Sequence, residues 1–232
     1  MRRWLWGRRY KSCSASSARA AGMPSGFSYV PDFIGAEQQS QLIDFLRQSD
    51  AWENQYRRKI LHFGYDYTYV HGQVTKQTFL GPLPPLVETL VDKIMSDGLS
   101  VGRPNMCLVC MYLEGEGVGM HIDRADLFGD TVLSLSLGRS EILTMSPIPL
   151  LPSSGFTGND PVTSKITFPV APGSIYALSG PARYSWKHGI KSKKSVLKKR
   201  YGHLERHQDY VITPKDETTA RYALTFREVL DQ

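Results

Sequence analysis

Residues 105–123 read NMCLVCMYLEGEGVGMHID and join an apolar, strand-like run to a His-x-Asp triplet. Residues i and i+2 of an extended segment point to the same side, so His121 and Asp123 can direct an imidazole and a carboxylate at one point. Two histidines, one carboxylate and open coordination positions make the facial triad that binds ferrous iron in non-haem oxygenases. The triplet therefore predicts a metal site that needs one further histidine.

The third ligand must come from the other five histidines of the chain. His188 is favoured because it follows a strand-turn pattern, APGSIYALSGP, whereas His62 lies among aromatic residues and His203 and His207 lie in a charged stretch. A His-x-Asp triplet alone also occurs as a hydrogen-bonded pair on the surface, so the metal prediction depends on the rest of the pattern.

The segment Arg221-Tyr-Ala-Leu-Thr-Phe-Arg227 supplies a second part of that pattern. In a strand, Arg221 and Arg227 share a face, and two guanidinium groups on a buried face need anionic partners. A dicarboxylate with one end on the metal would meet this need through bidentate pairing. The alternative is an edge strand with solvated arginines.

The order of elements indicates the fold class. Helices are predicted over 36–48 and 85–96, where apolar residues recur at helical spacing. The other predicted elements are strands at 27–30, 105–113, 131–137, 141–146, 165–170, 173–178 and 220–229, a hairpin or strands over 56–71, and loops at 75–85 and 147–164. Helices followed by a series of strands favour an α+β fold, with the strands closed as a double-stranded β-helix, or jelly roll.

The net charge of +6 is concentrated at the N-terminus. Residues 1–22 hold six basic residues and no acidic one, whereas the remainder holds 22 of each. This Ser- and Ala-rich leader predicts a mitochondrial transit peptide. A disordered basic arm, or an extension upstream of a second start at Met23, stays open, with the nucleus or cytoplasm as the alternative location.

Three domains follow: the leader 1–22, an N-terminal extension 23–104 with helices and a nucleotide-recognition segment, and a jelly-roll core 105–232. The three cysteines form no disulfide framework, which favours a reducing compartment. Cys107 and Cys110 form a C-x-x-C pattern but should face opposite sides of a strand. No apolar run reaches the length of a transmembrane helix, so no membrane partner is expected.

Together these motifs resemble the AlkB family of Fe(II)- and 2-oxoglutarate-dependent dioxygenases. The resemblance is nearest to the homologue otherwise fused to a tRNA methyltransferase. The matching segments are NMCLVCMY (105–112), GEGVGMHID (115–123), TVLSLSLG (131–138), HGI (188–190), RYALTFR (221–227) and, more weakly, RRKILHFGY (57–65).

The resemblance implies roles for particular residues. It assigns Fe(II) to His121, Asp123 and His188, 2-oxoglutarate to Tyr112, Arg221 and Arg227, and substrate binding to Arg57, Arg58, Lys59, Phe63 and Tyr65, with O₂ as the oxidant. Ser134, Ser136 and Gly138 are expected to be structural. The family usually has Asn where this chain has Cys110 and Ala223, which weakens the expectation of amide contacts to the co-substrate. Repair-type members have an acidic residue where this chain has Ala125.

The expected activity is hydroxylation or oxidative demethylation of alkylated or modified nucleobases in RNA or DNA, by a monomer. The basic segment 183–207 could follow a phosphate backbone; a solvated loop or a nuclear-localisation signal is the alternative. The aromatic residues of 56–69 could stack on a base; a hairpin with its aromatic residues buried in the core is the alternative. Likeness to the tRNA-acting homologue favours RNA over DNA. The alternatives are a protein or small-metabolite hydroxylase on the same fold and a non-catalytic binding module.

Overall fold

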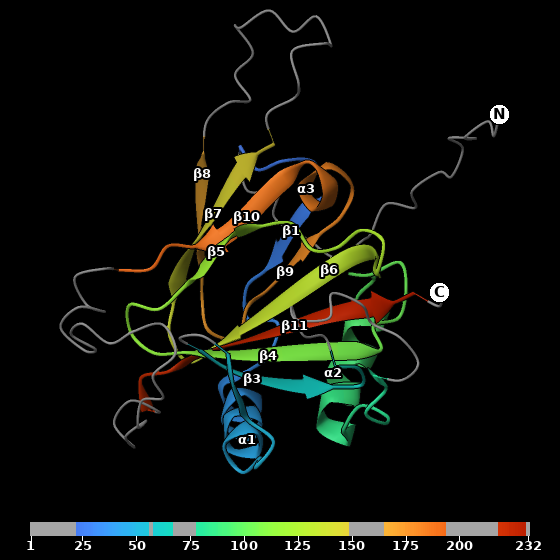
Figure 1. Ribbon diagram of the computed structural model, residues 1–232, viewed down its shortest axis with the longest axis vertical. Coiled ribbons are helices and arrows are strands. Elements are labelled where there is room, and N and C mark those ends of the chain that lie inside the picture. The colour runs from blue at the N-terminus through green and yellow to red at the C-terminus, as the bar shows by residue number, and fades with distance from the viewer. Residues whose placement is uncertain (1–21, 56–57, 67–77, 149–164, 194–217, 231–232) are drawn as a thin grey trace, which may run out of the picture.

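The structure is a computed structural model that describes residues 22–55, 58–66, 78–148, 165–193 and 218–230. Two antiparallel sheets face each other (Figure 1). The larger sheet contains, in spatial order, β1 (Phe27–Val30), β9 (Ile175–Leu178), β6 (Phe128–Leu137), β11 (Arg221–Val229), β4 (Met106–Tyr112), β3 (Arg58–Phe63) and β2 (Glu53–Gln55). The smaller sheet contains β5 (Val118–His121), β10 (Trp186–Ile190), β7 (Glu141–Pro147) and β8 (Ile166–Val170).

Two helices, α1 (Ala36–Arg47) and α2 (Pro85–Ser96), lie on one side of the larger sheet, and the smaller sheet lies on the other (Figure 1). Their buried residues pack with Tyr222, Leu224 and Phe226 of β11 in one hydrophobic core. Because side chains alternate along a strand, Arg221 and Arg227 point to the opposite face, toward the smaller sheet. The helices thus fix which side of β11 carries polar groups.

The observed architecture confirms the predicted α+β class with a jelly roll of antiparallel strands. Both long helices form within one residue of their predicted bounds. Four elements were not among the predicted strands and helices: β2, β5, β10 and the short helix α3 (Gly180–Tyr184). Strands β1, β2 and β3 join the same sheet as the core strands, so the predicted boundary at residue 104 does not separate two sheets.

Several predictions fall on residues outside the described ranges. They concern the leader over 1–21, Arg57, most of the loop 147–164, and residues 194–207 of the basic segment. The predicted transit peptide therefore stays a prediction. Within the described ranges, no helix has the length and hydropathy needed to cross a membrane.

The cysteines of β4 lie as their spacing predicts. Cys107 packs in the core beneath the helices, whereas Cys110 belongs to the apolar cluster on the opposite face, with Tyr112 and Ala223. Both are free thiols. Their separation across the sheet excludes a shared metal ion for this pair.

Candidate metal centre and anion pocket

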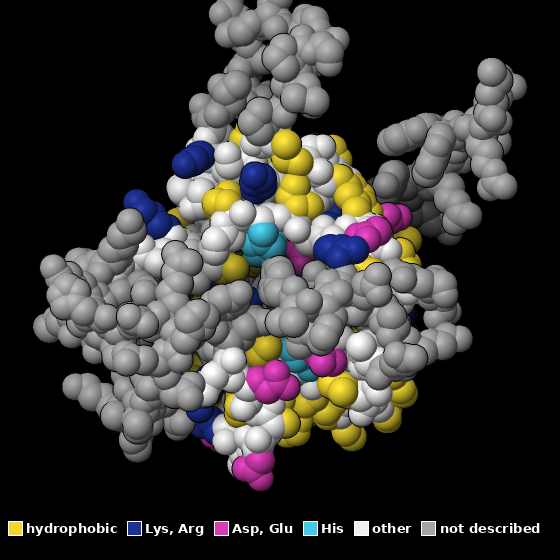
Figure 2. Space-filling view, viewed as in Figure 1, with side chains coloured by type: hydrophobic (Ala, Val, Ile, Leu, Met, Phe, Trp, Pro, Cys, Tyr) yellow, Lys and Arg dark blue, Asp and Glu magenta, His cyan; other side chains and the backbone are white. Residues whose placement is uncertain are grey.

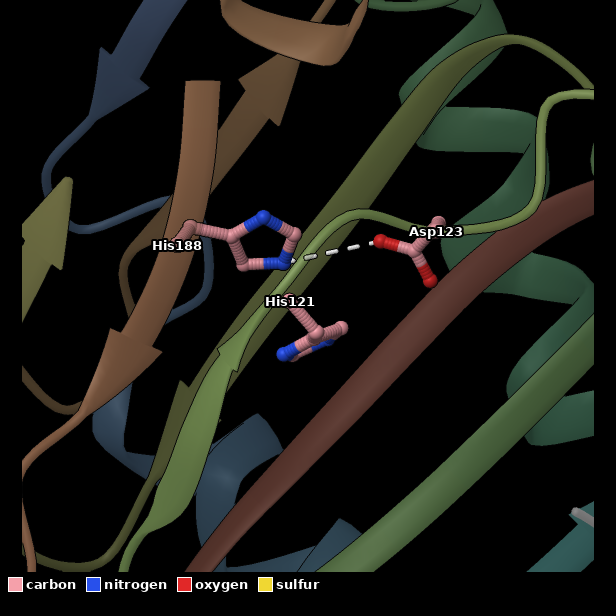
Figure 3. A group of neighbouring side chains, drawn as sticks. All are labelled: His121, Asp123 and His188. Carbon is pink, nitrogen blue, oxygen red and sulfur yellow. Dashed lines mark ion pairs between the residues drawn. The ribbon is translucent and has the colours of Figure 1, made fainter. Parts of the chain in front are cut away.

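The three predicted ligands converge between the two sheets (Figure 3). His121 ends β5 and His188 lies in β10, where the two residues are direct partners on neighbouring strands. Their ring centroids are 4.4 Å apart, and one ligand atom from each of His121, Asp123 and His188 lies within 4.8 Å of the others. The convergence predicted from the sequence is therefore confirmed, and the donor set is that of a facial triad.

The hydrogen bonding of His121 and the burial of His188 suit a metal. Nδ1 of His121 lies 2.8 Å from the carbonyl oxygen of Gly119, which can only accept a hydrogen bond. Nδ1 therefore carries a hydrogen, and Nε2 is the ring nitrogen that can bind a metal. Burial lowers the pKa of His188 to about 4, so this imidazole is neutral at pH 7. Neutral imidazoles are the form that binds a metal.

Asp123 is a buried carboxylate held on one side only. Arg227 donates to its Oδ1 through Nε at 2.8 Å and through Nη2. Burial alone would raise the pKa of Asp123, but the positive charges around it, that of Arg227 foremost, together outweigh burial and hold the pKa well below its usual range. Oδ2 has no hydrogen-bond partner among the described residues and lies 3.5 Å from Nε2 of His188. An unsatisfied buried carboxylate oxygen beside two imidazoles fits a bound cation.

The loop that carries Asp123 is fastened by Arg183 of α3. Nη1 of Arg183 donates to the carbonyl oxygen of Asp123 at 2.7 Å, and Nη2 donates to that of Arg124 at 3.0 Å. Arg183 is only 2% exposed, so its expected contact with a phosphate backbone is wrong. The sequence around Arg183 is rich in lysine and does not indicate this burial, because the contact joins Arg183 to a segment 60 residues earlier in the chain.

A second polar cluster, the candidate anion site, lies at the other end of β11. Arg221 is 2% exposed and donates through Nη2 to Oγ of Ser136 at 2.9 Å. None of the described carboxylates pairs with Arg221, and its Nε has no partner among the described residues. The Tyr112 ring lies 5.8 Å from the Arg221 guanidinium carbon. The charge of Glu141 acts on Arg221 without a direct ion pair between them. A buried cation without a described ion pair fits an anionic group such as the distal carboxylate of 2-oxoglutarate.

Ser136 lies on the core strand β6, as predicted, and is fully buried. Its hydroxyl also accepts a hydrogen bond from Arg221, a contact that the sequence did not predict. The reason is its register on β6, which brings it opposite Ala223 on β11 and hence beside Arg221. The alternating pattern of serine and leucine over 133–137 is the signal that indicates a polar face there.

The predicted substrate-binding residues separate in space. Phe63 stacks on Phe45 of α1 at 5.9 Å between centroids, on the helix side of the sheet, and Lys59 lies on that same side of β3. Neither is on the face of the larger sheet that points toward the smaller sheet and the metal ligands. Tyr65 packs against Phe79 at 5.1 Å. Arg58 is the member of this set whose described contact reaches the site, because its Nη1 donates to the Tyr112 hydroxyl at 3.2 Å.

Comparison with known proteins agrees with this geometry. Residues 26–227 match the model of a family described as the 2OG-Fe(II) oxygenase superfamily. The chain is 26% identical over 212 residues to the uncharacterized protein L905 of Acanthamoeba polyphaga mimivirus, covering 90% of this chain and 87% of that protein. It is 27% identical over 179 residues to the tRNA (carboxymethyluridine(34)-5-O)-methyltransferase ALKBH8 of Mus musculus, covering 74% of this chain.

The match spans only 25% of the mouse ALKBH8 protein and 31% of its Macaca fascicularis counterpart. Among solved structures, OsALKBH1 has a TM-score of 0.57 at 16% identity and covers 89% of this chain and 99% of its own. At that identity the likeness shows the fold alone, which agrees with the jelly roll described above. The family match spans most of the sequence and includes all three converging ligands, so the chain belongs to the 2OG-Fe(II) oxygenase superfamily, whose members use Fe(II), 2-oxoglutarate and O₂.

Proposed function

We propose that this protein hydroxylates or oxidatively demethylates an alkylated or modified nucleobase in nucleic acid, with RNA preferred to DNA. The observation that carries the oxygenase half of this proposal is the presence of two complementary groups of side chains between the sheets. One group consists of two imidazoles and a carboxylate that could hold a cation, and the other contains a buried cation without an ion pair to a described carboxylate. A metal ion and a dicarboxylate are the two ligands that such a pair fits.

The residues of the two groups would have different roles. His121, Asp123 and His188 would hold Fe(II), and Arg221 would bind the distal carboxylate of 2-oxoglutarate. Arg227 keeps Asp123 ionised and oriented. Iron and 2-oxoglutarate, when bound, would supply the oxidation, in which one oxygen atom of O₂ would enter a substrate C–H bond and the other succinate, with release of CO₂. A hydroxylated N-methyl group would then break down to the demethylated base and formaldehyde.

The nucleic-acid half rests on the relatives and on surface charge. Relatives in the comparisons include the tRNA methyltransferase ALKBH8 and a DNA N6-methyl adenine demethylase of Caenorhabditis elegans, which is 20% identical over 184 residues. Lys187, Lys191 and Lys193 are exposed on and just after the strand of His188. Figure 2 shows a histidine at the surface with lysine or arginine side chains around it. Such charges can contact phosphate.

Uncoupled turnover followed by competition tests the proposal. Succinate formation is measured with Fe(II), 2-oxoglutarate and O₂, and then tRNA, methylated RNA or DNA oligonucleotides, or peptides are added separately. We expect nucleic acid to stimulate turnover, RNA more than DNA, with formaldehyde released from N-methylated substrates. Stimulation by peptides alone would favour a protein hydroxylase. Turnover absent under every condition would favour a non-catalytic binding module.

A charge variant locates the nucleic-acid surface. Replacing Lys187, Lys191 and Lys193 with Ala should raise the KM for the nucleic acid and reduce its dependence on salt, while uncoupled succinate formation stays unchanged. Lys93→Ala on α2 is the control, because Lys93 lies on the helix side of the larger sheet and pairs with Asp97. Equal effects of the two variants would reject this surface.

A further inference from the structure

Arg58, Tyr112 and Arg221 form a row across three neighbouring strands of the larger sheet. Strand pairing sets Arg221 of β11 directly opposite Tyr112 of β4. On the other side of β4, Lys59 of β3 lies opposite Met111, so the adjacent Arg58 lies opposite Tyr112. Residues at one level of a sheet share a face with their direct neighbours. All three therefore belong to the face of the larger sheet that points toward the smaller sheet.

Contacts join the three side chains. Nη1 of Arg58 donates to the Tyr112 hydroxyl at 3.2 Å, while the Arg221 guanidinium carbon lies 5.8 Å from the centre of the Tyr112 ring. One tyrosine, 4% exposed, is thus flanked by two guanidinium groups. Burial holds the pKa of Tyr112 well above its usual range, so the phenol is neutral and offers no charge to balance them.

The next row of the same face offers little to an anion. It consists of Ile60, Cys110 and Ala223, which are direct partners on β3, β4 and β11. A thiol is a weak hydrogen-bond donor, and the other two side chains are apolar. Recognition of a carboxylate at this end of the sheet therefore falls on the Arg58–Tyr112–Arg221 row, together with Ser136.

We infer that Arg58 is a co-substrate-binding residue, which forms with Arg221 and Tyr112 a two-cation cradle for the distal carboxylate of 2-oxoglutarate. This replaces the expectation that Arg58 contacts the nucleobase. Arg58 holds the Tyr112 hydroxyl in place and adds a second positive charge beside Arg221. The inference rests on the proposed role of Arg221 but is independent of which substrate is oxidised.

Binding of 2-oxoglutarate without a substrate tests the inference directly. Calorimetry with Mn(II) in place of Fe(II) avoids turnover and gives the Kd for wild type, Arg58→Ala, Arg58→Gln and Arg58→Lys. We expect Ala and Gln to weaken binding ~10- to 100-fold, the range for losing a charged hydrogen bond, and Lys to keep most of the affinity. Lys59→Ala is the matched control, since it removes the same charge from the opposite face of β3 and should leave the Kd within about twofold.

A monocarboxylate separates charge recognition from a structural effect. The compound 2-oxopentanoate has a methyl group where 2-oxoglutarate has its distal carboxylate. Wild type and Arg58→Gln should bind it equally. Equal weakening toward both compounds would overturn the inference, as would an unchanged 2-oxoglutarate Kd in Arg58→Gln.

Arg221→Ala distinguishes failure of this inference from failure of the proposed role of Arg221 in binding 2-oxoglutarate. If Arg221→Ala loses affinity for 2-oxoglutarate and the Arg58 variants do not, only the role of Arg58 is rejected. If Arg221→Ala binds 2-oxoglutarate normally, the proposed role of Arg221 is rejected, and with it the role of Arg58. Melting temperatures of all variants, measured alongside, identify any that fail to fold, and Arg58→Lys then carries the comparison.

Discussion

Arg227 donates two hydrogen bonds to a single oxygen of Asp123, Oδ1, and leaves the other oxygen, Oδ2, facing His188 (Figure 3). The two carboxylate oxygens of Asp123 therefore have different roles. Oδ1 anchors the side chain to β11, which belongs to the larger sheet, and Oδ2 stays available beside the imidazoles of the smaller sheet. One ion pair thus links the metal centre to the strand that also carries Arg221.

Replacing Arg227 with Met, which keeps an unbranched apolar side chain but removes the charge, should strongly destabilise the metal-free protein. Removing one partner of a buried ion pair typically costs about 3–5 kcal/mol, because the remaining charge is left uncompensated. Urea unfolding of the metal-stripped protein gives the free energy of unfolding. Arg47→Met, at a largely exposed pair with Asp44, should cost less than about 1 kcal/mol. A similar small loss for both variants would contradict the assignment.

A double variant tests the same pair from the other side. Asp123→Asn combined with Arg227→Met should cost less than the sum of the two single changes, because each single variant leaves one buried charge unpaired and the double variant leaves none. Additive losses in the urea measurement would mean that the two side chains do not interact in solution.

Metal binding should stabilise the folded chain by mass action. With free Mn(II) at 100 times its Kd, the free energy of unfolding should rise by about 2.7 kcal/mol, and a chelator should reverse the change. His121→Ala should abolish this increase. His62→Ala is the control, because His62 is a buried histidine that contacts Asp66 outside the triad, and it should keep the metal-dependent gain. Retention of the gain in His121→Ala would place the metal elsewhere.

The sequence was sufficient for those parts of the site that lie close together along the chain. Alternation in an extended segment predicted that His121 and Asp123 share a side, and the same reasoning paired Arg221 with Arg227. His188 was favoured on its local context, and its position next to His121 on the neighbouring strand confirms the prediction. In these cases a short-range rule of strand geometry decides where the side chain points.

The contacts of the site that the sequence did not predict depend on pairing between strands that are far apart along the chain. The contact of Arg58 with Tyr112 spans 54 residues and follows from the register of β3 against β4, which no local pattern specifies. Ser136 reaches Arg221 through the register of β6 against β11. Arg183 looked like one more surface cation in a basic segment, and only the fold buries it against the loop of Asp123.

Burial of Cys107 predicts slow alkylation. The pKa of its thiol is raised well above its usual range, because the side chain is fully buried in the core beneath the helices. Thiolate is the reactive form, and an unperturbed cysteine titrates near pH ~8.5. Raising the pH from 7 to 9 should therefore speed labelling of Cys107 by iodoacetamide in urea but hardly at all in the folded protein, as measured by mass spectrometry of the labelled peptide. Equally fast labelling in both states would mean that Cys107 is accessible.

Arg183 should act as a positioning residue for the metal centre. Its guanidinium holds two successive carbonyl groups of the segment that carries Asp123, and it lies five residues before His188. Loss of contacts that orient metal ligands typically weakens metal affinity ~10- to 100-fold. Arg183→Met should therefore raise the Kd for Mn(II) within this range, and Arg183→Lys should recover only part of the loss, because a single ammonium cannot reproduce the planar fork.

The control for Arg183 is another arginine that binds backbone carbonyls. Arg139 donates to the carbonyl oxygens of Thr219 and Leu113 and pairs with Glu141, but it contacts no residue of the triad. Arg139→Met should lower the melting temperature while leaving the Kd for Mn(II) unchanged. A purely structural role for Arg183 would give the same result as Arg139, with lower stability and normal metal affinity. A fall in metal affinity specific to Arg183 would instead show that its two hydrogen bonds hold the Asp123 loop in the geometry that the metal requires.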